Sequence, residues 1–152
     1  MHYKMGVIVV CLLLAGAAIW SLASVPAEAL RLPYDDAQSV SRGEMLYADN
    51  CASCHGADLQ GASNWRQPDA DGRMPAPPHD KTGHTWHHPG EVLFRLTKLG
   101  TAVVVGEGYE SNMPGFSDTL SDQDILDILG YIKSTWPQEI IEMHNGMTAN
   151  TN

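Results

Sequence analysis

Cys51-Ala52-Ser53-Cys54-His55 is the stretch of this sequence that decides its fold. Two thiols separated by two residues lie on one turn of the chain, where each can add across a vinyl group of a heme to form a thioether. The histidine directly after the second cysteine is then held beneath the porphyrin centre, where its imidazole can bind the iron. The motif therefore predicts one heme c per chain, attached through Cys51 and Cys54, with His55 as an axial ligand.

Other uses of this cysteine pair fit the spacing poorly. A C-x-x-C redox pair is expected beside a βαβ pattern, and the sequence contains none. A zinc site would have to recruit His84 and His88, but 29 residues separate Cys54 from His84, far more than in a zinc finger. No second C-x-x-C-H occurs, so a single heme is expected.

The first 29 residues have the order of a secretory signal peptide. A short, weakly basic start is followed by an apolar run and then by Ala27-Glu28-Ala29, which fits the small-x-small cleavage pattern. We therefore expect export to the periplasm, with residues 1–29 removed or residues 5–23 retained as an anchor in the cytoplasmic membrane. Cys11 follows Val10 rather than the small residue of a lipoprotein site, so we assign it no role.

The composition is that of one globular domain with an acidic surface. The 152 residues are 43% hydrophobic and 18% charged, and the formal net charge is −9 at pH 7. Repulsion from phosphates excludes nucleic acid as an expected partner, whereas an acidic surface suits a protein with a basic docking face. We expect this domain over residues 30–137, followed by a polar, frayed tail over residues 138–152.

Short helices and long loops alternate within the domain. Apolar periodicity predicts helices over Asp36–Asn50 and Pro89–Leu99, and Ser121-Asp122-Gln123-Asp124 is a capping-box start for a further helix. The polar stretches Gly56–His88 and Gly100–Asp118 are expected to be ordered loops. The predicted fold class is all-α, with three to four short helices and long loops wrapped around one heme.

Four stretches resemble a class I, mitochondrial-type cytochrome c domain: Gly43-Glu44-Met45-Leu46-Tyr47, Cys51 to Gly56, Met113-Pro114-Gly115-Phe116 and Leu129-Gly130-Tyr131-Ile132. The resemblance extends over residues 36–137 and implies the class I cytochrome c fold. It implies that the N- and C-terminal helices cross and that Gly43 allows close approach to the aromatic face around Tyr131. It also implies that Met113 is the second axial ligand.

The residues alone leave the sixth iron ligand open among Met113, Met74 and the loop histidines. Met113 is favoured because it lies in a glycine-rich loop, followed by Pro114 and Phe116, and because a thioether is a soft ligand that favours ferrous iron. Met74 also precedes a proline, but it follows His55 by only 19 residues, where chain is needed to wrap the His55 side of the heme.

Trp86 lies among four loop histidines: His79, His84, His87 and His88. We interpret this segment as a polar loop beside the heme edge, where Trp86 or a histidine bonds a propionate. Clustered imidazoles outside the cytoplasm could instead bind copper, which would indicate a metal-handling or sensing protein. A carbonyl of Pro77 or Pro78 is expected to accept the Nδ1 proton of His55 and so fix its ring.

Together these features predict a periplasmic one-electron carrier, not an enzyme, that serves redox proteins of a respiratory or dehydrogenase chain. With both axial positions filled by His55 and Met113, the iron changes charge without binding a substrate. A heme enzyme with a displaceable sixth ligand is the alternative.

The attachment motif predicts that the purified protein carries one heme that survives acid-acetone extraction. Cys51→Ala should remove one of the two thioether bonds and sharply lower the yield of protein with covalently attached heme. Absorption spectra before and after extraction measure both effects. Release of free heme from the wild-type protein, or bound zinc without a Soret band, would contradict the assignment.

Overall fold

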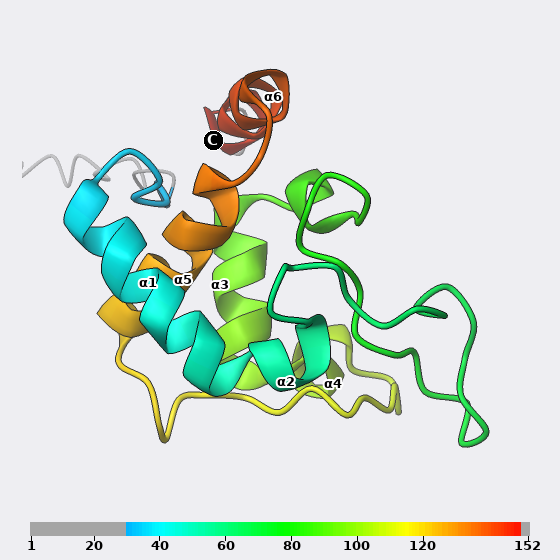
Figure 1. Ribbon diagram of the computed structural model, residues 1–152. Coiled ribbons are helices and arrows are strands. Elements are labelled where there is room, and N and C mark those ends of the chain that lie inside the picture. The colour runs from blue at the N-terminus through cyan, green and yellow to red at the C-terminus, as the bar shows by residue number, and fades with distance from the viewer. Residues whose placement is uncertain (1–29, 150–152) are drawn as a thin grey trace, which may run out of the picture.

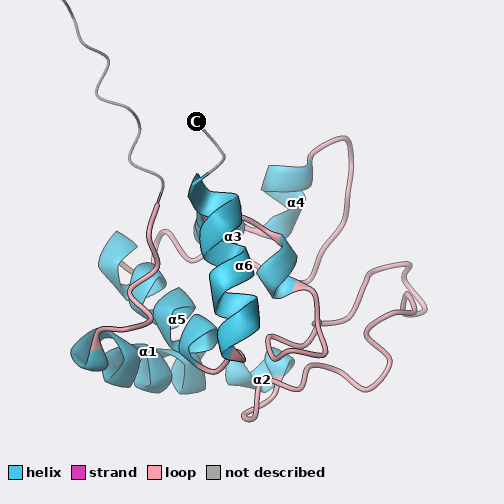
Figure 2. Cartoon of the chain, turned by 90° about the horizontal axis from the view of Figure 1, so that it is seen from above, coloured by secondary structure: helices cyan, strands magenta, loops and turns pink. Residues whose placement is uncertain are grey.

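Two long helices, α1 (Ala37–Asn50) and α5 (Asp122–Ser134), cross each other and form the framework of the protein (Figure 1). The side chain of Asp36 caps α1 by accepting a hydrogen bond from the Ser39 backbone N–H at 2.7 Å. A reciprocal capping box between Ser121 and Asp124 starts α5, as the sequence predicted. The computed structural model describes residues 30–149, which contain helices and loops but no strand (Figure 2).

The crossing depends on Gly43, which lies buried in α1 against the backbone of α5. A Cβ atom at this position would overlap the carbonyl oxygen of Asp127. The close approach that the resemblance implied around Tyr131 lies one turn earlier in α5, at Asp127 and Ile128. Tyr131 instead packs beside Tyr47, with ring centroids 5.6 Å apart, while Gly43 brings the two helix backbones together.

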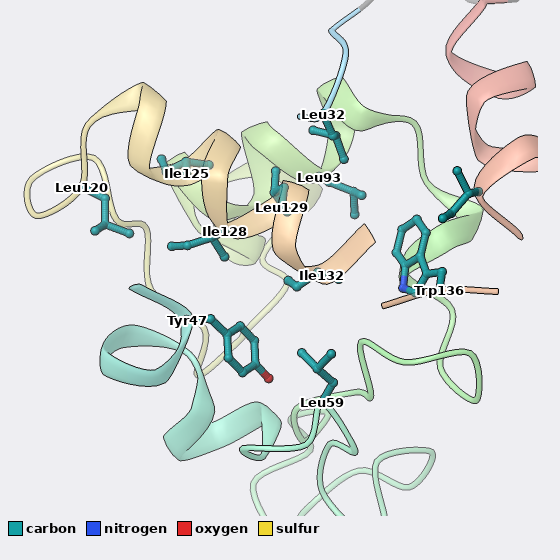
Figure 3. Close-up of a cluster of buried hydrophobic side chains, with 11 residues drawn as sticks. Leu32, Tyr47, Leu59, Leu93, Leu120, Ile125, Ile128, Leu129, Ile132 and Trp136 are labelled. Atoms are coloured by element: carbon teal, nitrogen blue, oxygen red, sulfur yellow. The ribbon is translucent and has the colours of Figure 1, made fainter. Parts of the chain in front are cut away.

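The hydrophobic core fills the space around α5 (Figure 3). Its apolar face supplies Ile125, Ile128, Leu129 and Ile132, each no more than 4% exposed. Tyr47 reaches this core from α1, and its hydroxyl donates to the Gly56 carbonyl at 2.8 Å. The core thus borders the turn that contains the two cysteines, since Cys51 and Ala52 pack against it.

Shorter helices complete the expected frame. α2 (Ala52–His55) follows α1 immediately, and α3 (Gly90–Leu99) confirms the predicted middle helix. The first long loop is ordered and contains only a 3-10 turn, η1 (Thr85–His87). The second loop was expected to be irregular throughout, yet it begins with the five-residue helix α4 (Thr101–Val105). A helix this short, rich in β-branched valine, leaves no periodic signal in the sequence.

The prediction of a frayed tail after residue 137 is wrong, because α6 (Gln138–Ala149) continues the fold. Pro137 starts α6, since its carbonyl accepts from the backbone N–H groups of Ile140 and Ile141. Ile141 is 6% exposed and His144 is fully buried. The buried positions of α6 thus include polar His144 as well as apolar Ile141, so its sequence lacks the continuous apolar stripe that marks a helix.

Residues 1–29, which include the predicted signal peptide and the alternative anchor over residues 5–23, lie outside the described residues. Within residues 30–149 no helix combines the length and the apolar character needed to cross a bilayer.

We expect Gly43→Ala to lower the free energy of unfolding of the holoprotein by about 1–3 kcal/mol, because α1 and α5 must move apart to admit the methyl group. Gly146→Ala is the matched control, since a methyl group there meets no atom within 4 Å; it should leave stability unchanged or raise it. Denaturant unfolding followed by circular dichroism measures both. Equal free energies of unfolding for the two variants would show that α1 and α5 can move apart at Gly43 without loss of stability.

Candidate heme site

The two cysteines lie on the turn that joins α1 to α2. Cys51 is the C-cap residue of α1. Its carbonyl accepts hydrogen bonds from the backbone N–H groups of Cys54 at 3.2 Å and His55 at 3.0 Å. Both thiols are free, with Cys51 half-buried and Cys54 exposed. Burial, together with the neighbouring Cys54, raises the pKa of the Cys51 thiol to about 11. Two free thiols on one turn suit addition to two vinyl groups.

The imidazole of His55 is buried and held in one orientation. Its Nδ1 atom lies 2.9 Å from the carbonyl oxygen of Pro77, which identifies the proline that the sequence left open between Pro77 and Pro78. Because Nδ1 donates to this carbonyl, the Nε2 lone pair is free to bind a metal ion. Burial lowers the pKa of His55, although the Pro77 carbonyl acts in the opposite direction.

His79 stacks on His55, a contact that sequence reasoning missed. The two ring centroids are 4.0 Å apart and the ring planes differ by 22°. An imidazole binds iron through a ring nitrogen whose lone pair lies in the plane of the ring. A ring stacked face to face on His55 therefore cannot be the second axial ligand of the iron that His55 binds. His79 is itself fixed, because its Nδ1 lies 2.8 Å from Thr85 Oγ1 and its carbonyl accepts from Trp136 Nε1 at 2.7 Å.

Trp86 provides a test of whether these residues fit a heme. Its indole Nε1 is a buried side-chain atom without a hydrogen-bond partner among the described residues. An indole N–H can only donate, and an unpaired buried donor is uncommon. A heme propionate would satisfy it, as the sequence suggested for Trp86 or a histidine. The paired thiols, the fixed imidazole and this donor together fit heme c.

Met113 lies half-buried in the loop after α4, where two hydrogen bonds hold it. Its backbone N–H donates to Ser111 Oγ at 3.1 Å, and its Sδ atom accepts from Thr101 Oγ1 at 3.3 Å. The loop is fixed further along by Phe116, whose N–H donates to the carbonyls of Thr97 and Lys98 at the end of α3. The thioether is therefore presented on an ordered support.

Met74 lies closer to the Met113 loop than the sequence suggested. Its neighbour Arg73 donates to Glu110 Oε2 at 3.2 Å and to Asn112 Oδ1 at 2.9 Å. The expectation that this segment wraps the His55 side of the heme is therefore not a reason to exclude Met74. The choice between Met113 and Met74 therefore rests on the contacts that hold Met113 in its loop.

The histidine cluster of the first loop does not converge on one point. His84 stacks on Trp65 and meets His88 edge to face, each with ring centroids 5.5 Å apart. Among residues 30–149 no group of three or more His, Cys, Asp or Glu side chains is arranged to hold a metal ion. The copper-handling alternative therefore gains no support from the described residues.

The loop that contains these histidines is anchored by α6, which the sequence did not predict. Nε2 of the buried His144 lies 3.0 Å from the His88 carbonyl, and its Nδ1 lies 3.0 Å from Lys133 Nζ. Burial and the nearby Lys133 ammonium lower the pKa of His144 to about 4, and burial lowers the pKa of Lys133 to about 8. A neutral His144 can donate to one partner and accept from the other.

Comparison with known proteins places this site in a family context. The family model described as Cytochrome c matches residues 40–136. The chain is 29% identical over 122 residues to the cbb3-type cytochrome c oxidase subunit FixP of Azorhizobium caulinodans, covering 80% of this chain and 38% of that protein. It is 40% identical over 62 residues to the cbb3-type cytochrome c oxidase subunit CcoP of Rubrivivax gelatinosus, covering 41% and 19%.

The chain therefore spans less than two fifths of the length of these curated relatives. No solved structure is significantly similar to it.

The buried His144 predicts a pH dependence of stability. Folding lowers its pKa from 6.5 to about 4, so its contribution is complete above pH 6.5 and is lost as the pH falls towards 4. Wild-type holoprotein should therefore lose up to about 3 kcal/mol more unfolding free energy over this interval than His144→Gln. Denaturant titrations at several pH values measure the difference.

An unchanged slope in His144→Gln would mean that protonation of His144 does not limit acid stability.

Proposed function

This chain belongs to the cytochrome c family and uses covalently bound heme c for electron transfer; from that premise we propose that it is a periplasmic carrier with His55 and Met113 as the axial iron ligands. The heme supplies the one-electron couple when bound. The protein holds the two ligands, keeps water from the iron and presents the heme edge to redox partners.

The observation that carries this proposal is the fixed state of His55. His55 is 7% exposed, its Nδ1 is bonded to the Pro77 carbonyl, and His79 covers one face of its ring. An imidazole restrained in this way changes position little when the iron changes charge. Small rearrangement of the ligands is what a carrier needs, because the protein then undergoes little reorganisation during transfer.

Met113 is the ligand that the surrounding contacts support best. Its backbone and its sulfur are each hydrogen-bonded within the loop, and a thioether favours the ferrous state and raises the potential. With both axial positions filled by side chains, no open coordination site remains for a substrate. The proposed function is accordingly electron transfer without catalysis.

The partners we propose are redox proteins of a respiratory chain. Both relatives are named as subunits of cbb3-type cytochrome c oxidases, so donation of electrons to a terminal oxidase is the context that we favour. The net charge of −9 suits a partner with a basic docking face, to which association should weaken as salt screens the attraction.

Replacement of Met113 by Ala tests the ligand assignment. The ferric wild-type protein should be low-spin and show the weak sulfur-to-iron charge-transfer band at the red edge of its spectrum. Met113→Ala should abolish this band, raise the spin state, lower the reduction potential and admit cyanide rapidly, because a soft neutral donor is lost. Optical spectra and a redox titration measure these changes.

Met74→Ala is the matched control and should keep the wild-type spectrum. Loss of the band in Met74→Ala but not in Met113→Ala would reassign the ligand to Met74. A bis-histidine spectrum that neither variant alters would instead point to a loop histidine.

A further inference from the structure

The hydroxyl of Thr101 lies 3.3 Å from the sulfur of Met113, within hydrogen-bond distance for a sulfur acceptor. Thr101 is the first residue of α4, and both side chains are half-buried. A hydroxyl has one proton to donate, and here the acceptor is a thioether, which accepts weakly. Such a weak hydrogen bond does not by itself bring Thr101 and Met113 together, so the backbone must hold the two residues side by side.

Two glycines provide this support by allowing the backbone before α4 to touch the backbone after Met113. A Cβ atom at Gly100 would lie 2.8 Å from the Gly115 nitrogen, and one at Gly115 would lie 2.6 Å from the Leu99 carbonyl carbon. Gly100 also has a φ of +86°, which other residues rarely adopt. Thr101 and Met113 flank this crossing, so their side chains are brought to the same place.

Hydrogen bonds on both sides of the contact between Gly100 and Gly115 keep the two backbone segments aligned. On one side, the Phe116 N–H donates to the carbonyls of Thr97 and Lys98, both at 3.1 Å. On the other, the Met113 N–H donates to Ser111 Oγ at 3.1 Å. The position of the sulfur relative to the Thr101 hydroxyl is therefore set by the backbone.

We propose that Thr101 is a positioning residue for Met113, whose hydroxyl occupies one sulfur lone pair and leaves the other to bind the iron. Because it requires Met113 as the sixth ligand, this role rests on the function proposed above. A hydrogen bond draws electron density from the sulfur and makes it a weaker donor to ferric iron. Hydrogen bonds to sulfur ligands are among the factors that set the potential of an iron centre.

Thr101→Val removes the hydroxyl at nearly constant volume and tests this role in the holoprotein. The sulfur should become a stronger donor to ferric iron, so the reduction potential should fall and the charge-transfer band should shift. Imidazole, which competes with Met113 for ferric iron, should bind about fivefold more weakly, the effect of about one hydrogen bond. Redox titration and optical imidazole titration measure the two effects.

Thr101→Ser retains a hydroxyl and should restore wild-type values. Thr135→Val is the matched control, since the Thr135 hydroxyl bonds the Ile132 carbonyl near the end of α5 at 2.7 Å, outside the support of Met113, and it should leave the potential and the band unchanged. A purely structural role for Thr101 predicts the opposite sign for imidazole, because a loosened loop would release Met113 and strengthen imidazole binding.

The results separate this role from the function on which it depends. Absence of the charge-transfer band from wild-type protein, or its survival in Met113→Ala, would overturn both. If Met113→Ala abolishes the band but Thr101→Val keeps the wild-type potential and imidazole affinity, the role of Thr101 is refuted and Met113 remains the ligand. Stronger imidazole binding in Thr101→Val also refutes it.

Discussion

The hydrogen bond between His55 and the Pro77 carbonyl joins the turn that carries the cysteines to the long loop that follows it. The ring contacts on the His55 side of the site follow from this bond. It sets the face of His55 on which His79 stacks, and His79 is in turn held through its carbonyl by Trp136. The orientation of one imidazole is thus connected to the C-terminal part of the chain through consecutive hydrogen bonds and ring contacts.

The two loops play different parts in this arrangement. The loop over residues 56–88 is tied to His55 and to α6, whereas the loop that contains Met113 is tied to the end of α3 by backbone contacts. Arg73 connects the two through Glu110 and Asn112. Separate supports for the two proposed ligands explain why so much of the chain is ordered without regular secondary structure.

Much of the frame could be predicted because its signals are local. The capping residues of α1 and α5, the apolar stripe of α3 and the C-x-x-C-H turn are each read from a few neighbouring residues. The helix α6 was missed because its buried positions include polar His144 and leave no continuous apolar stripe, and the stacking of His79 on His55 joins residues 24 apart in the sequence. The choice of Pro77 depends on a turn geometry that no pattern in the sequence encodes.

The contacts of the C-terminal segment also bear on the order in which the protein can be assembled. Trp136 and His144 follow Cys54 by 82 and 90 residues, and together they hold both ends of the segment from His79 to His88. A chain made from its N-terminus exposes the cysteine turn long before these two side chains exist. The contacts that close the His55 side of the site can therefore form only after α6 has been made and has docked.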